Sequence, residues 1–212
     1  AMHDYGPDIY AEPAHVDVDT LANLGPLRAM AGIWRGTMGV DVNPKAKGPR
    51  TQSFIDHIEL QPIDPQTNGP QLLYGLRYHQ HVVTPDEDGT FHDQIGYWLW
   101  EPATQTVMQT LSIPRGQTAL AMGTATPDAR SFELVAKHGE TINGVCSNPF
   151  LEEAFTTLAY RIRIDVHADG QWSYEEETTL MLRGRKEPFA HKDRSTLVKI
   201  AEPTPNPLAR KR

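Results

Sequence analysis

Gly96-Tyr-Trp-Leu-Trp100 is the stretch that decides the fold, because it carries large side chains at every position after its glycine. Side chains alternate along a strand, so Trp98 and Trp100 would point to one face and the residues between them to the other. Leu72-Leu-Tyr-Gly-Leu-Arg-Tyr78 has apolar residues on both faces in the same way. A two-sheet sandwich would show clear alternation in most of its strands. A barrel with an apolar interior and a partly covered outside accommodates this pattern better.

The rest of the chain supplies further runs of β-branched, aromatic and apolar residues. These runs are Ile33–Val40, Ser53–Leu60, Gln71–Val83, His92–Trp100, Thr106–Ser112, Thr118–Thr124, Ser131–Lys137, Thr156–Val166, Gln171–Leu182 and Ser195–Ile200. Turn sequences such as Pro85-Asp-Glu-Asp-Gly89 separate them, and Asp-Gly is a strong hairpin signal. The repeated helical patterns of an α/β protein are missing. The sequence therefore predicts an all-β fold, a single antiparallel meander β-barrel of about ten strands with an internal cavity.

The two ends of the chain differ in composition from this central region. Residues 1–24 mix Pro, Asp and His and predict an N-terminal arm, with a short helix near 20–31. Residues 25–201 form the predicted barrel. Residues 202–212 contain three prolines and end in Ala209-Arg-Lys-Arg212, which predicts a disordered C-terminal tail.

Composition and charge exclude several classes of protein. The 212 residues carry 20 basic and 27 acidic side chains, a net charge of −7, whereas a nucleic-acid binder normally has a basic footprint. No apolar run approaches the ~18 residues that a membrane helix needs, and no secretion signal is visible. Cys146 is the single cysteine, so a disulfide framework is excluded. We expect a cytoplasmic protein with no nucleic-acid or membrane partner.

Four segments resemble the nitrobindins, a family of heme-binding barrels related in shape to the fatty-acid-binding proteins. They are Leu27-Arg-Ala-Met-Ala-Gly-Ile-Trp-Arg-Gly36, Phe91-His-Asp-Gln-Ile-Gly-Tyr97, Thr110-Leu-Ser-Ile-Pro-Arg-Gly116 and Pro188-Phe-Ala-His191 with Leu197-Val-Lys-Ile200. Their order and spacing agree with the family over residues 27–200. The arm, the loop at 43–50 and the segment at 137–153 are additions. Lys192-Asp-Arg194 stands where the family prefers apolar residues.

The resemblance implies a cofactor, a set of site residues and a reaction. The cofactor would be ferric heme b, with His191 as the axial ligand to the iron and the opposite iron face open. His92 matches a second family histidine on the distal side, where it would take part in catalysis. Phe91 and Ile113 match positions that face the heme plane. Nitrobindins isomerise peroxynitrite to nitrate in the ferric state and bind nitric oxide in the reduced state.

Other interpretations of the same residues remain open. Taken without the resemblance, His191 is a solvated loop histidine and His92 is a surface histidine at a strand end. Glu175–Glu177 is expected to be a solvated acidic stretch. The strongest alternative function is a heme-free carrier of a fatty acid or another apolar small molecule in the cavity. A heme carrier or sensor without turnover is a further alternative, and a homodimer is a possible assembly.

Overall fold

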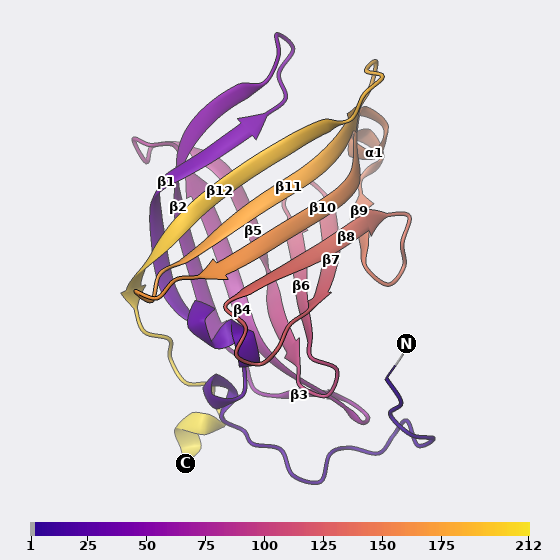
Figure 1. Cartoon of the computed structure of the whole chain (residues 1–212), viewed down its shortest axis with the longest axis vertical. Helices are drawn as coiled ribbons and strands as arrows, with labels where there is room; N and C mark the ends of the chain where they lie inside the picture. Colours follow the sequence, from indigo (N-terminus) through magenta and orange to yellow (C-terminus); the bar gives the residue numbers. More distant parts are fainter. Residues whose placement is uncertain (1–2) are drawn as a thin grey trace.

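Ten long strands close into a barrel in the computed structural model, which describes residues 3–212 (Figure 1). They are β1 (Gly32–Asn43), β2 (Arg50–Pro62), β4 (Gln71–Val83), β5 (Thr90–Glu101), β6 (Thr106–Ile113), β7 (Gln117–Thr124), β8 (Ser131–His138), β10 (Phe155–Val166), β11 (Trp172–Leu182) and β12 (Phe189–Ala201). Antiparallel pairing of β1 with β12 and of β2 with β4 closes the ring. Each of the ten predicted runs falls on one of these strands, and the predicted all-β barrel is confirmed; the one departure from an antiparallel meander among the described strands is β9 (Gly144–Ser147), which pairs in parallel with β8.

Two short strands and one helix add to the ring. The three-residue β3 (Gln66–Asn68) extends the edge of β4. β7 and β8 pair directly only at Met122 and Val135, and above that point β9 (Gly144–Ser147) enters between them as an eleventh strand. The helix α1 (Pro149–Ala154) follows, and the side chain of Asn148 caps it by accepting a hydrogen bond from the backbone N–H of Leu151 (3.1 Å).

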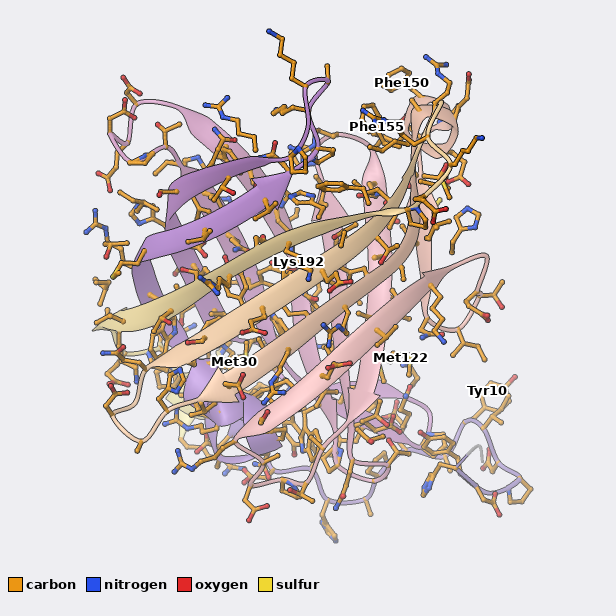
Figure 2. The ribbon with its side chains drawn as sticks, turned by 45° about the horizontal axis from the view of Figure 1, so that its top comes forward. Tyr10, Met30, Met122, Phe150, Phe155 and Lys192 are labelled. Carbon is orange, nitrogen blue, oxygen red and sulfur yellow. The ribbon has the colours of Figure 1, made fainter. Side chains whose placement is uncertain are left out.

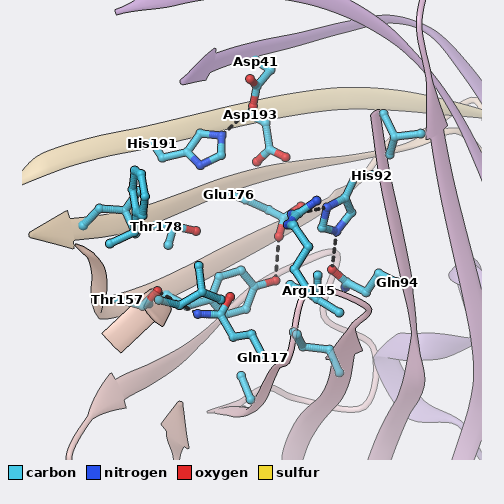
Figure 3. A pocket seen from close by; sticks show the side chains of 18 of the residues that line it. Asp41, His92, Gln94, Arg115, Gln117, Thr157, Glu176, Thr178, His191 and Asp193 are labelled. Carbon is cyan, nitrogen blue, oxygen red and sulfur yellow. Dashed lines mark hydrogen bonds and ion pairs between the residues drawn. The ribbon is translucent and has the colours of Figure 1, made fainter. Parts of the chain in front are cut away.

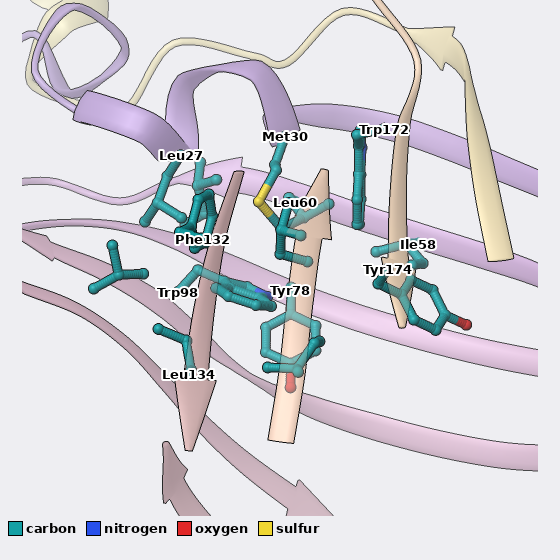
Figure 4. Close-up of a cluster of buried hydrophobic side chains, with 14 of the residues drawn as sticks. Leu27, Met30, Ile58, Leu60, Tyr78, Trp98, Phe132, Leu134, Trp172 and Tyr174 are labelled. Carbon is teal, nitrogen blue, oxygen red and sulfur yellow. The ribbon is translucent and has the colours of Figure 1, made fainter. Parts of the chain in front are cut away.

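An apolar core fills the lower half of the barrel (Figure 4). Two short 3₁₀ helices, η1 (Thr20–Ala22) and η2 (Gly25–Met30), lie at this lower end in Figure 1 and take the place of the helix predicted near 20–31. Leu27 and Met30 are fully buried. The Trp34 indole is also buried, donates a hydrogen bond to the Met30 carbonyl (2.8 Å) and meets Trp172 edge to face at 5.9 Å. These contacts close the lower end, so a ligand must enter from the other end.

The C-terminal segment 202–212, predicted as a disordered tail, lies against the N-terminal arm and the barrel. It includes the 3₁₀ helix η3 (Ala209–Lys211), and Asn206 is 1% exposed. The Asn206 side chain donates to the Val18 carbonyl and to Asp64 (both 2.8 Å) and accepts from the backbone N–H of Thr20 (3.1 Å). One amide thus ties the tail to the N-terminal arm and to the barrel, a tertiary effect that composition does not reveal.

The upper end of the barrel is open and partly apolar. Figure 2 shows Phe150, in α1, and Phe155, the first residue of β10, at this end, while Tyr10 lies on the N-terminal arm at the opposite end. Phe150 and Phe155 are 62% and 41% exposed, and their rings lie 6.2 Å apart. None of the helices between residues 3 and 212 is long and apolar enough to cross a membrane.

Candidate functional site

The upper half of the barrel encloses a cavity of about 390 Å³. Eleven of its 23 lining residues are apolar, and they come from several strands of the ring and from α1. These apolar residues are Pro44, Phe54, Val82, Phe91, Leu111, Ile113, Ala119, Val145, Leu151, Phe155 and Leu180. A concave site that combines apolar walls with converging polar side chains is typical of a small-molecule site. The cavity predicted from the sequence is therefore present and has an open end.

His191 lies on β12 and faces this cavity (Figure 3). Its Nε2 donates a hydrogen bond to Oδ1 of Asp41 on the neighbouring β1, at 2.7 Å. Asp41 is only 3% exposed and also accepts a hydrogen bond from Asn43 (2.6 Å). No described group bonds to Nδ1 of His191, so this nitrogen is free to contact a ligand in the cavity. Asp41 thereby fixes the tautomer and the orientation of the imidazole.

The charged residues that follow His191 do not disturb this arrangement. Lys192 and Arg194 are exposed on the outer face of β12, and Lys192 lies 3.9 Å from Glu177. Because side chains alternate along the strand, His191 and Asp193 face inward. His191 is therefore a strand residue on the cavity wall and not the solvated loop histidine of the alternative interpretation.

His92 lies on β5 and faces the same cavity from another part of the ring. Its Nε2 bonds to the amide oxygen of Gln94 (3.0 Å), and its Nδ1 accepts a hydrogen bond from Arg115 (3.1 Å). Burial lowers the pKa of His92, and the charge of Arg115 acts in the same direction. His92 is thus a neutral imidazole with both ring nitrogens engaged.

The remaining two predicted site residues are apolar members of the cavity wall. Phe91 stacks on Phe54 with ring centroids 6.3 Å apart, and both rings line the cavity. Ile113, at the end of β6, lines it too. The structure therefore brings His191, His92, Phe91 and Ile113 to one cavity, although their sequence positions span 101 residues from first to last.

Three carboxyl groups on the cavity wall were missed by the sequence analysis. Asp41, Asp193 and Glu176 lie directly opposite one another on the adjacent strands β1, β12 and β11. Glu176 was expected in a solvated stretch; instead it faces inward, with Tyr174 on the same face. Burial raises the pKa of Glu176 and, together with Glu176, raises the pKa of Asp193 well above its usual range. We call these three residues the acidic wall.

A belt of hydrogen-bonded side chains forms the floor of the cavity. Gln94 and Gln109 both donate to the Tyr78 hydroxyl, at 2.6 and 3.2 Å. The Tyr160 hydroxyl lies 2.9 Å from the amide oxygen of Gln109 and 2.7 Å from Glu176. Because Gln94 also bonds to His92, the belt connects the His92 side of the cavity with the acidic wall. It separates the cavity from the apolar core below.

Asp56 on β2 lies beside this belt and is completely buried. It accepts hydrogen bonds from Gln80 (3.1 Å) and from the Tyr174 hydroxyl. Burial raises the pKa of Asp56 to about 7, a shift that these two hydrogen bonds only partly oppose.

The residues of this site fit a heme better than a bare metal ion. Within residues 3–212, no three His, Cys, Asp or Glu side chains are arranged to hold a metal ion. A heme iron needs only one or two protein ligands, because the macrocycle supplies the others. His191 offers one such ligand, with a free nitrogen and a carboxylate partner behind it. The apolar walls suit the porphyrin faces.

Comparison with known proteins agrees with this assessment. Residues 23–199 match the model of a family described as the THAP4-like, heme-binding beta-barrel domain. The crystal structure of Rv2717c from M. tuberculosis is similar, with a TM-score of 0.60 and 20% sequence identity over 86% of this chain and 99% of that chain. At this identity the likeness concerns the fold. No match is found among the curated proteins. The family model spans most of the chain and all four predicted site residues, and the chain therefore belongs to the THAP4-like, or nitrobindin, family of heme-binding β-barrel domains.

Proposed function

We propose that this domain holds a ferric heme b through His191 and isomerises peroxynitrite to nitrate, binding nitric oxide in the reduced state. The observation that carries the proposal is the difference between the two cavity histidines. His191 has one nitrogen bonded to Asp41 and one nitrogen free, whereas both nitrogens of His92 are engaged. Of the two, His191 is therefore the residue able to ligate iron.

Asp41 acts as the positioning residue of His191. A hydrogen bond from the second ring nitrogen to a carboxylate fixes the ring and raises the basicity of the ligating nitrogen. Since Asp41 is buried and also held by Asn43, it cannot easily follow the imidazole away from the cavity. This arrangement favours the positively charged ferric iron of the resting protein.

The opposite side of the cavity serves the small substrate. When bound, the heme supplies an open iron position at which a small oxyanion or a diatomic gas can react. Arg115 places a positive charge on the cavity wall, where it attracts anionic peroxynitrite, and it also orients His92. The apolar walls exclude water and keep reactive fragments together until they recombine.

The test is the decay of peroxynitrite followed by stopped flow, with nitrate and nitrite measured as products. The heme-loaded wild type should accelerate the decay and raise the nitrate yield. His191→Ala, given the same heme, should lose the acceleration, and Arg115→Gln should weaken it while keeping heme bound. Decay rates equal to that of free heme in the wild-type sample would reject the proposal.

A second candidate, a heme carrier or sensor without turnover, is favoured by one observation. The His92 ring donates to Gln94 and accepts from Arg115, so it has no free group with which to assist a reaction. This candidate predicts full heme binding and reversible binding of nitric oxide, with no acceleration of peroxynitrite decay.

A further inference from the structure

Acidic side chains gather on one wall inside the cavity, and basic side chains gather at its open end. Asp41, Asp193 and Glu176 of the acidic wall pair across neighbouring strands and face the interior. Like charges directly opposite each other in a sheet are destabilising. A ligand carboxylate brought to this wall would lie beside three carboxyl groups that already crowd one another, and burial already raises the pKa of Glu176 and of Asp193. The acidic wall therefore disfavours a ligand carboxylate, whereas the cation of Arg115 lies elsewhere on the cavity lining.

The open end, in contrast, carries a basic groove of about 320 Å³ between two turns. One turn, residues 44–49, joins β1 to β2, and the other, residues 183–188, joins β11 to β12; both lie at the upper end in Figure 1. The groove is lined by Pro44, Lys45, Gly48, Pro49, Leu182, Arg185, Lys186, Glu187, Pro188 and Phe189. Its three cations face a single carboxylate in a chain whose net charge is −7.

These three cations have no ion-pair partner among residues 3–212. In the part of the chain that the structure describes, Lys45, Arg185 and Lys186 form no ion pair, whereas Arg183 of the same turn pairs with Glu153 at 2.8 Å. The nearby Lys47 and Arg50 are unpaired as well among the described residues. An acidic protein that leaves its cations unpaired at one opening attracts anions to that opening.

The groove is continuous with the cavity. Pro44 lines both spaces. Phe189 lines the groove and lies two positions before His191 on β12, so the groove begins about 7 Å along the strand from the imidazole. A ligand that contacts His191 and extends toward the opening therefore reaches Lys45, Arg185 and Lys186.

We propose that this basic groove binds the carboxylate groups of an amphipathic ligand whose apolar body fills the cavity. The acidic wall below and the basic groove above together set the orientation of that ligand. This proposal rests on the function proposed above, in which the ligand is heme and its carboxylates are the two propionates. A fatty acid would present the same chemistry, and it would then lie with its carboxylate at the opening and its chain inside.

Esterified ligands test this proposal, because methylation removes the charge and leaves the apolar body unchanged. The wild type is titrated with ferric heme and with the dimethyl ester of heme, and the Soret band reports binding. In a second assay, oleate and methyl oleate compete with a fluorescent fatty acid. The variant is K45Q/R185Q/K186Q. The control is R28Q/R130Q/K211Q, which removes the same charge from exposed positions away from the groove.

We expect wild type and control to bind free-acid heme about tenfold more tightly than its ester, since a few exposed ion pairs contribute about 1.4 kcal/mol in all. The groove variant should lose this preference while its ester affinity stays unchanged. Equal affinity of wild type for acid and ester would overturn the proposal.

The failure of the heme function would look different. Suppose that oleate binds and heme does not. The proposed role of the groove is then supported if wild type prefers oleate over methyl oleate and the groove variant shows no such preference, and it is overturned if wild type binds both equally. If none of the four probes binds, the proposal is refuted.

Discussion

Asp56→Asn should change the pH dependence of stability, because Asp56 is a buried carboxyl inside the barrel. Its pKa is raised from an ordinary 3.8 to about 7 in the folded protein. Between these two pH values the folded chain holds a proton that the unfolded chain has released. The folded state is therefore favoured at low pH, and the contribution of this group to stability is lost as pH rises toward 7.

The size of the effect follows from the shift. Each pKa unit corresponds to about 1.4 kcal/mol, so three units amount to about 4 kcal/mol between pH 4 and pH 8. Asparagine has nearly the same shape and carries no charge at any pH. The stability of Asp56→Asn relative to wild type should therefore rise by about 4 kcal/mol over this range.

Urea unfolding followed by tryptophan fluorescence, repeated at each half unit of pH, measures this difference. Asp128→Asn, at an exposed turn, is the control for the loss of one carboxylate. The free energies of unfolding of wild type and Asp56→Asn are compared across this pH range. A difference that changes by less than 1 kcal/mol, a quarter of the expected change, would refute the claim that burial raises the pKa of Asp56.

Three further substitutions test the site and the barrel. Asp41→Asn should weaken heme binding about 10–100-fold, since it removes the carboxylate that positions His191, the proposed axial ligand; an unchanged affinity in a Soret titration would contradict this role. His92→Leu should retain heme but alter the association kinetics of nitric oxide in stopped flow, and kinetics equal to wild type would argue against a distal role. Gly96→Ala should destabilise the barrel by about 2–3 kcal/mol in urea unfolding, because the new Cβ would lie 1.8 Å from the Thr110 carbonyl oxygen. Gly89→Ala, whose Cβ meets nothing closer than 3.4 Å, is its control.

The strands and the closure of the barrel could be predicted from local patterns. Large residues on both faces of Gly96–Trp100 indicated a barrel, and Trp98 and Trp100 are indeed buried in its core. β9 was not predicted, because it exists only where β7 and β8 part and leave room for it. That separation is a property of the closed ring and leaves no mark on the local sequence.

The site was only half visible in the sequence. The resemblance to nitrobindins predicted His191 as a site residue, and His191 lines the cavity, although its neighbours Lys192 and Asp193 suggest a solvated loop. Glu176 and Asp193 were missed because charged residues are normally placed outside. Strand alternation carried the missing signal, since Glu176 shares a face with the buried Tyr174 and Asp193 shares one with the buried Leu197. The hydrogen bond between Asp41 and His191 joins residues 150 positions apart and could only come from the structure.

The proposed axial role of His191 is tested by titrating the purified protein and His191→Ala with ferric heme. We expect a Soret shift that saturates at one heme per chain in the wild type and is lost in the variant. Control titrations of Asp41→Asn and His92→Leu should both saturate, the first more weakly. A wild type that does not saturate, or a variant that binds heme with the same spectrum, would contradict the assignment of His191 as the axial ligand.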